Sequence, residues 1–266
     1  MIKFFRKIRQ QLLIENKTGR YLKYAIGEII LVVIGILIAL QINTWNEDRK
    51  AQKQETAILK QLRVEFESNL KQLDEKIRSK QELMNSAIQL FKYIDEPSLR
   101  NKDSINYHLG RTIPYSTFDP IVNDLASSGN LRLIRNDTLK QLLSFWTTEI
   151  VQVQEDDASW KTYRNELYIP FLISHYQLRT IRTKATRSNV LGKYLIEDDD
   201  VTSEPAEDIG LTSHPEDFNA LLDQPDFEDH LERCYTTNQF ANTQSLILRK
   251  RIVEIIDILN REIKGD

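Results

Sequence analysis

The chain contains little cysteine, glycine or proline. Its 266 residues include one cysteine, eight glycines and seven prolines. A single cysteine excludes an internal disulfide framework, so Cys234 does not identify the compartment of the protein. Few glycines and prolines exclude an architecture of many short strands joined by turns, and favour long helices. The hydrophobic fraction of 41% and the charged fraction of 28% are typical of a globular protein rather than a disordered one.

The sequence also lacks catalytic and metal-binding motifs. It has no HExxH, CxxC, P-loop or GxGxxG pattern, and its four histidines are dispersed. His230 and Cys234 are four residues apart, a spacing that can hold a metal, but no further ligand is identified. A cysteine in the seam of a helical bundle is the more ordinary interpretation. We therefore predict that the protein is not an enzyme and has no catalytic, cofactor-binding or metal-binding residues, and the net charge of −3 argues against a nucleic-acid partner.

One long apolar run occupies residues 25–42 and is interrupted by only two polar residues. With its aromatic neighbours Tyr24 and Trp45 it covers about 20 residues, enough for a helix to cross roughly 30 Å of hydrocarbon. Aromatic residues at both ends suit the two membrane interfaces. A typical cleaved signal peptide has a shorter basic segment before its apolar run, and it has small residues at a cleavage site after that run. This sequence has neither feature. We predict an uncleaved transmembrane helix over residues 23–44, with a signal peptide or a buried core helix as alternatives.

Basic residues predict the orientation of this helix. Seven lysines and arginines precede it, whereas three lie in the fifteen residues after Asn43. This bias keeps the N-terminus in the cytoplasm and exports the C-terminal domain. Residues 1–22 form a basic segment with Phe5, Ile8 and Leu12 on one helical face. Such a segment either lies on an anionic leaflet as an amphipathic helix ending near Gly19, or is a basic flank that only sets topology.

Small residues and a carboxylate mark one face of the apolar run. Gly27, Gly35 and Ala39 are spaced in multiples of four, which lets two helix backbones approach closely. Glu28 lies about one turn inside the cytoplasmic end, where its side chain can reach the lipid headgroups. Glu28 is either such a boundary residue or part of a contact with a basic or hydroxyl group on a partner helix. The candidate helix–helix contact therefore comprises Gly27, Glu28, Gly35 and Ala39, and the expected partners are membrane lipid and either another protein or a second copy of the chain.

Three long segments after the membrane repeat their apolar residues every three or four positions, which predicts long helices with narrow seams. The first runs from residue 58 to 94, with its apolar repeat interrupted only at Lys80, and ends before Pro97. The second begins after a cap at Asn136 or Asp137 and is kinked or ended by Pro170. The third starts near Asp226. The predicted fold is therefore all-α: the transmembrane helix continues into an antiparallel, coiled-coil-like bundle over residues 45–266, with core positions that include Trp146, Trp160 and the C-terminal seam Phe227, Leu231, Cys234, Asn238, Ala241, Ser245, Leu248, Ile252, Ile255 and Leu259.

The connecting regions give weaker patterns. We predict a short helix over Ile121–Ala126 followed by Gly129, and then an extended linker from Leu131 to Ile134. Glu155, Asp156 and Asp157 are interpreted as a solvated helix face. Residues 174–196 carry five basic side chains and no acid, whereas residues 197–232 carry fourteen acids and no base. The acidic loop over 197–215 lacks the spacing and glycine of a calcium site, so we interpret it as solvated, in a position where it could face the basic stretch.

Three segments carry a resemblance to a known family: "MIKFFRKIRQQLL", "YAIGEIILVVIGILIALQINTWNE" and "LASSGNLRLIRNDTLKQLL". Together they resemble an uncharacterised family, a domain of unknown function, of single-pass membrane proteins from Gram-negative bacteria. The resemblance implies an inner-membrane protein with a periplasmic helical domain, and it supplies no catalytic residue. It also implies that Gly27, Glu28 and the exit through Asn43, Trp45 and Asn46 belong to a family pattern.

These observations predict a protein that acts by binding. We expect a membrane-anchored scaffold or accessory subunit of a membrane complex. The alternative is a receptor-like periplasmic sensing module that acts through a partner protein. The scaffold is favoured because a cytoplasmic segment of about 23 residues is too short for a signalling domain of ordinary size. A sensor requires a pocket between helices, which the sequence does not reveal.

Overall fold

The computed structural model describes residues 18–122, 130–187 and 209–265, and within these ranges it contains helices and no strand. The chain divides into two compact units, residues 1–58 and residues 59–266. Helix α2, Thr18–Asp95, supplies the described part of the first unit and the first long helix of the second. The all-α fold class predicted from the apolar periodicity is therefore confirmed.

In the first unit, α2 exposes apolar side chains on every side. The twelve leucine, isoleucine and valine residues between positions 25 and 42 are each 47–64% exposed. None of the residues in the most apolar 18-residue window is buried. By length and composition this stretch can cross a membrane. Since a core helix buries at least one face, the alternative of a buried core helix is not supported for this segment. The described part of α2 starts at Thr18 and continues through Gly19, near which a break was predicted; residues 1–17 of the basic segment lie outside the described residues.

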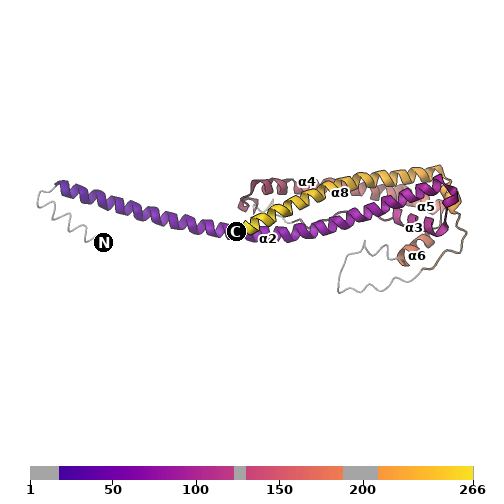
Figure 1. Ribbon diagram of the computed structural model, residues 1–266, viewed down its shortest axis with the longest axis horizontal. Helices are drawn as coiled ribbons and strands as arrows, with labels where there is room; N and C mark the ends of the chain where they lie inside the picture. Colours follow the sequence, from indigo (N-terminus) through magenta and orange to yellow (C-terminus); the bar gives the residue numbers. More distant parts are fainter. Residues whose placement is uncertain (1–17, 123–129, 188–208, 266) are drawn as a thin grey trace. The chain divides into compact units, whose positions relative to one another are not determined.

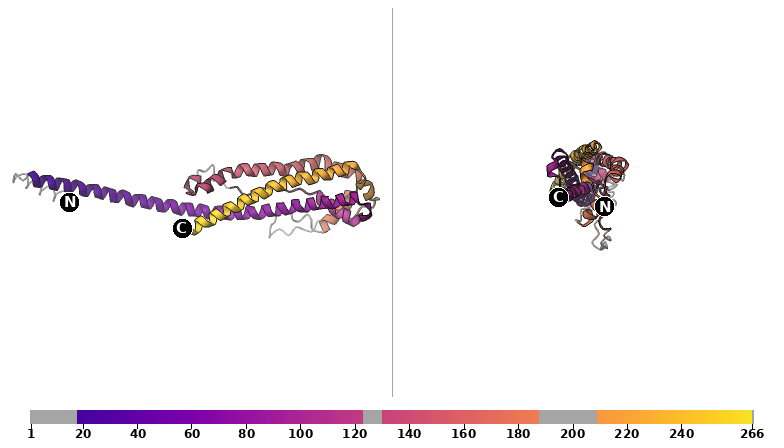
Figure 2. Two further views of the ribbon diagram at one scale, coloured as in Figure 1. Left: turned by 45° about the horizontal axis from the view of Figure 1, so that its top comes forward. Right: turned by 90° about the vertical axis from the view of Figure 1, so that its right-hand side faces the viewer.

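The second unit is built from three long helices (Figures 1 and 2). These are the later part of α2, α4 at Asp137–Tyr163 and α8 at Pro225–Gly265. Helix α8 runs antiparallel to α2, because Asp74 pairs with Arg249 while Lys80, further along α2, bonds Ser245 earlier in α8. It is likewise antiparallel to α4, through the bond from Asn136 to Glu262 and the pair of Glu149 with Arg251. Helices α2 and α4 are consequently parallel to each other.

The predicted seams form the core of this unit. All ten predicted core positions of α8 are at most 4% exposed. Trp146 and Trp160 of α4 are 4% and 2% exposed, and the ring centroid of Trp146 lies 4.8 Å from that of Phe66 on α2. Burying these side chains stabilises the bundle by about 1.5–3 kcal/mol for each large apolar residue. The core position of both tryptophans is thus confirmed.

Short helices pack around the end of the bundle where α2 stops. They are η1 at Pro97–Leu99, α3 at Lys102–Thr112, α5 at Ile169–His175, α6 at Leu178–Arg187 and α7 at Phe218–Leu222. Apolar side chains of α3, α5, α6 and α7 join those of α2, α4 and α8 in one continuous cluster, which includes Leu90, Leu109, Tyr168, Leu172, Ile181, Leu222 and Phe227. At this end of the bundle, the short helices therefore add a layer to the three long helices.

The helix ends follow the predicted signals. Helix α2 stops at Asp95, two residues before Pro97. The side-chain oxygen of Asn136 accepts the backbone N–H of Leu139 at 2.9 Å and caps α4. Near Pro170 the helix does not break but widens into a π-helical turn, η3, at Arg164–Tyr168. Proline has no N–H to donate into the preceding turn, which favours such a local rearrangement. The predicted kink or end at Pro170 therefore takes the form of this turn.

One local prediction between the long helices is wrong. Residues 130–133 form a 3-10 helix, η2, rather than an extended linker, because the N–H of Ile134 folds back onto the carbonyl of Leu131. The predicted short helix is described only at Ile121 and Val122, which are not helical; Asn69 of α2 bonds both backbone groups of Ile121. The rest of that predicted helix, Gly129 and residues 197–208 of the acidic loop lie outside the described residues.

Candidate functional site

The four residues of the candidate helix–helix contact lie in the first unit on α2. At about 100° of rotation per residue, Glu28, Gly35 and Ala39 fall within a narrow arc, and Gly27 lies about a quarter turn away. A methyl group added to either glycine would meet no described residue within 4 Å. This face therefore leaves room for a second helix backbone, and the proposed contact stays a prediction.

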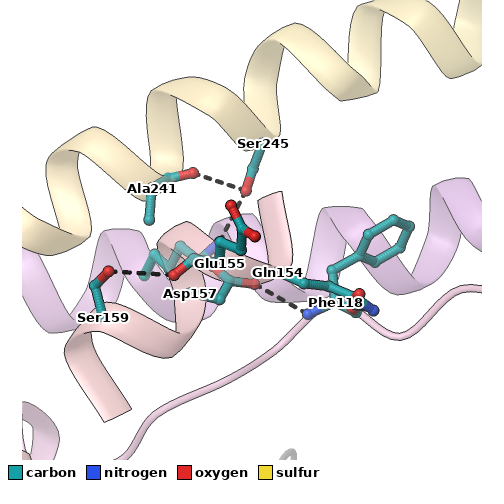
Figure 3. Close-up of polar contacts among 8 residues, drawn as sticks. Phe118, Gln154, Glu155, Asp157, Ser159, Ala241 and Ser245 are labelled. Carbon is teal, nitrogen blue, oxygen red and sulfur yellow. Dashed lines mark hydrogen bonds and ion pairs between the residues drawn. The ribbon is translucent and has the colours of Figure 1, made fainter. Parts of the chain in front are cut away.

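The bundle core contains a buried ion pair that the sequence pattern did not predict. The Lys80 ammonium of α2 contacts the Asp157 carboxylate of α4, and their side chains are 3% and 0% exposed. Lys80 also donates to the Ser245 hydroxyl of α8 at 2.8 Å, and Asp157 accepts the backbone N–H of Phe118 at 3.0 Å. Figure 3 shows Asp157, Ser245 and Phe118 converging from three different segments. Burial raises the pKa of Asp157, and the Lys80 ammonium opposes that rise.

This cluster corrects the prediction for Asp157. An acidic triplet on a helix is usually solvated, and Glu155 is indeed exposed. Asp157, however, faces the core because Lys80 occupies the place in the α2 seam where an apolar residue was expected. The interruption of the seam at Lys80 was the one available signal, since a lysine at a core position requires a buried partner.

Side chains of α2 and α4 bind the extended return segment, residues 113–122, along its backbone. Asn69 bonds both the N–H and the carbonyl of Ile121 at 2.8 Å, and Gln72 does the same for Asp119 at 3.0 Å. The Trp160 indole N–H donates to the carbonyl of Pro114 at 3.2 Å. These bonds replace the strand or helix partners that the return segment lacks. The polar residues inside the bundle thus hold a connecting segment against the core.

A cluster of aromatic side chains surrounds His230. Its ring nitrogen Nδ1 lies 2.9 Å from the Tyr163 hydroxyl, and burial lowers the pKa of the imidazole. The Tyr168 hydroxyl lies 2.7 Å from that of Thr112, and burial raises the pKa of Tyr168. Cys234 is fully buried, which raises the pKa of its thiol well above the usual value. These groups satisfy one another in a packed core. No group of three or more possible metal ligands occurs among the described residues.

A largely apolar cavity lies between α3, the start of the return segment, the π-helical turn and α6. Its volume is about 430 Å³. Arg164 and Arg182 are the two charged residues in its wall, and Arg164 donates to the carbonyl of Ile113. Sequence patterns could not reveal it, because its wall joins two stretches that are distant in the chain, residues 110–115 and residues 164–185. We call it the arginine cavity; its other lining residues are Gly110, Ile113, Pro114, Tyr115, Ile169, Leu178, Ile181 and Ala185.

A second, more polar groove lies between α2 and α3. It is lined by Ser86, Tyr107, His108 and Arg111, among others. His108 Nδ1 lies 3.3 Å from the Ser86 hydroxyl, and burial together with Arg111 lowers the pKa of this histidine. The Arg111 guanidinium stacks on the Tyr107 ring, 3.5 Å from its centroid. Ser86 lies within a continuous helix rather than on the sharp turn that exposes many serine nucleophiles, so this pair is interpreted as a packing contact.

One comparison with known proteins gives a match. The model of a family described as "Family of unknown function (DUF6090)" matches residues 28–106, less than a third of the chain. The matched stretch includes Glu28, Gly35 and Ala39, the remainder of α2 and the first half of α3. It leaves out residues 1–13 and 125–143, two of the segments that carry the resemblance described above. No curated protein and no solved structure matches the chain.

Proposed function

We propose that the chain is a single-pass inner-membrane protein that displays its second unit in the periplasm and acts there, without catalysis, as a scaffold or accessory subunit of a membrane complex. The observation that carries the proposal is the apolar stretch of α2 exposed on all sides. The excess of basic residues before this stretch supports a cytoplasmic N-terminus.

The energy of insertion supports a membrane location. Each of the twelve exposed leucine, isoleucine and valine residues contributes about −0.3 to −0.6 kcal/mol to insertion, or about −4 to −7 kcal/mol in total. A carboxylate at the centre of a membrane costs about 2.5–3.5 kcal/mol, and Glu28 lies near the end of the helix, where the cost is lower. Insertion is therefore favourable even with Glu28 ionised.

The outer surface of the bundle supports a role in binding a partner. Phe240 and Ile247 of α8 are 58% and 59% exposed. They are seven residues apart and so lie on one face of the helix. Leu246 beside them is 48% exposed. A row of exposed apolar side chains on a helix that is otherwise packed into a bundle is typical of a protein–protein contact.

The receptor-like sensing module is the second candidate, and the arginine cavity is the observation that favours it. A sensing domain needs a site for a small molecule between its helices, and this cavity is of a suitable size. The scaffold stays the first candidate because core side chains of the described residues fill the space between the three long helices, which leaves no room for a small molecule there.

Topology is tested with a reporter fused after Asp266. We expect the fusion to be active in the periplasm and inactive in the cytoplasm. A reporter active only in the cytoplasm would overturn the orientation and with it the exported role of the bundle.

Crosslinking in native membranes tests the scaffold. We expect one discrete product with a different protein, weakened by the double substitution Phe240→Gln/Ile247→Gln. Val64→Gln is the matched control, because Val64 is an equally exposed apolar residue on α2. Recovery of monomer alone, or an equal effect of the control, would contradict the scaffold.

The transmembrane contact is tested separately. Gly35→Ile should weaken association through the helix face that carries Gly35 and Glu28, whereas Val33→Ile, on another side of α2, should not. Glu28→Leu distinguishes the two roles of the carboxylate. If association and co-purification do not change in Glu28→Leu, the side chain only extends to the headgroups.

A further inference from the structure

The arginine cavity has the composition of a small-molecule site. Its volume of about 430 Å³ falls in the range of about 300–1,000 Å³ that is usual for ligand pockets. Six aliphatic side chains supply most of its wall, and its two charged residues are both cationic. All ten lining residues belong to the described part of the chain, and none of them is acidic.

The local sequence explains why a cavity forms here. Pro170 favours the π-helical turn, and Arg164 is the first residue of that turn. At Gly110 helix α3 lies close to α6: a Cβ at this position would be in van der Waals contact with α6, 3.4 Å from Cγ2 of Ile181 and 3.7 Å from Cβ of Ala185. The two helices thus meet through small side chains at one edge of the cavity, and larger side chains surround the rest.

The two arginines of the cavity wall carry like charges, and Arg182 is exposed to solvent. Arg164 is half-buried and uses two of its five N–H donors on the Ile113 carbonyl and the Asn165 side chain. Burial lowers the pKa of Arg164, and the positive charge of Arg182 acts in the same direction. Helix α6, which carries Arg182, contains no acidic residue to offset these charges. An anion bound between the two guanidiniums would offset both charges, and the planar fork of arginine suits carboxylate and phosphate oxygens.

We propose that the arginine cavity binds one amphipathic anion, an alkyl chain that ends in a carboxylate or a phosphate. The chain lies against the aliphatic wall formed by residues such as Ile169, Leu178 and Ile181, and the anionic head lies between Arg164 and Arg182. The inference deepens the receptor-like candidate and rests on it for a biological role. The binding itself does not depend on the orientation of the chain in the membrane or on a partner protein.

Binding is tested with the full chain in nanodiscs of a zwitterionic lipid. Decanoate is titrated in a calorimeter, and the heat of titration into empty nanodiscs is subtracted. Decyl phosphate distinguishes the two possible head groups. Decanol and decyltrimethylammonium carry a chain of the same length without the negative charge. We expect saturable binding of one decanoate or decyl phosphate per chain, and at least about tenfold weaker binding of decanol and of the cation.

Substitutions then place the site. Arg182→Gln should weaken binding of the anion about tenfold, because it removes a charge-assisted hydrogen bond. Arg187→Gln removes the same charge from the same helix outside the cavity and should leave the affinity unchanged. Leu178→Trp should abolish binding by filling the cavity, and the thermal unfolding midpoint of each variant checks that it is folded.

Three results would overturn the inference: uptake no greater than that of empty nanodiscs, equal binding of decanol and decanoate, or equal affinities of the original chain and Arg182→Gln. Each of these would leave the scaffold standing, because that role is tested by crosslinking. Conversely, loss of the crosslinked product in the scaffold test would not change the heat of decanoate binding.

Discussion

Replacing Asp157 by asparagine should destabilise the bundle strongly. The change leaves the Lys80 ammonium 3% exposed without its counter-charge. Removing one partner of a buried ion pair costs about 3–5 kcal/mol, a large part of the 5–15 kcal/mol that is usual for a whole domain. Asparagine keeps the size of the side chain and an oxygen for the Phe118 N–H, so the loss measures the missing charge rather than a cavity.

The double substitution Lys80→Met/Asp157→Leu gives the sharper test. It removes both charges together and fills the space with apolar atoms. Two polar groups then lose a partner. The N–H of Phe118 loses its acceptor at a cost of about 1–3 kcal/mol, and the Ser245 hydroxyl loses the Lys80 donor but still donates to the carbonyl of Ala241. The double variant should therefore be more stable than either single variant, Lys80→Met or Asp157→Leu, in strong departure from additivity.

The assay is urea unfolding of the full chain in nanodiscs, followed by tryptophan emission. Trp146 and Trp160 are buried in the core of the bundle, and a Trp45→Phe background removes the signal from the membrane segment. Asp74→Asn is the control, because it breaks a more exposed ion pair of the same helix α2, with Arg249 of α8, whose side chains are 34% and 42% exposed. We expect a loss of about 0–1 kcal/mol there. The reasoning is refuted if Asp157→Asn costs no more than this control, or if the loss in the double variant equals the sum of the single losses.

Three further predictions concern the return segment, the histidine cluster and the cysteine. Asn69→Ala removes both hydrogen bonds to Ile121 and should lower the unfolding free energy by about 1–3 kcal/mol in the same urea assay. Hydrogen exchange at the Ile121 amide should become faster, and an unchanged exchange rate would contradict the role of Asn69 in holding the return segment. Burial lowers the pKa of His230, so between its folded and unfolded pKa values the folded state binds fewer protons, and stability should fall as the pH drops below about 6.5. His230→Phe should reduce that fall, measured as the unfolding free energy at about pH 7.5 and about pH 5.5, and an identical fall in both proteins would argue against this origin. Cys234 is fully buried with a raised pKa, so its alkylation should be slow in the native protein and accelerate through the urea transition; rapid labelling without urea would show that the seam opens locally.

The seams of the long helices could be predicted because helical burial is a local, periodic property. All ten positions of the C-terminal seam from Phe227 to Leu259 are buried, including the polar Asn238 and Ser245. The caps and ends at Asn136 and Pro97 were also accessible, since each depends on a few neighbouring residues. The same reasoning failed at Asp157, because its burial depends on a lysine 77 residues earlier in the chain.

Local sequence patterns could not predict the connecting regions or the arginine cavity, for a related reason. The extended backbone at Ile121 is held by Asn69, and nothing within a few residues of Ile121 signals that partner. The cavity needs the contact of α3 with α6 and the turn before Pro170, and these contacts exist only after the bundle has assembled. The amino-acid pattern likewise did not distinguish the parallel pair α2 and α4 from an antiparallel one, because amphipathic helices bury the same stripe in either direction.

Local patterns of residues were enough to predict that the protein is helical, where its three long seams lie, and that residues 25–42 are apolar enough to cross a membrane. Those properties follow from the order of neighbouring side chains and the periods of a helix. The folded arrangement was needed to show that α2 and α4 run parallel, that Lys80 and Asp157 meet in the core, and that Arg164 and Arg182 line one cavity. Each of these depends on which distant segments pack together, and packing is selected by the free energy of the whole bundle rather than by any one stretch of the chain.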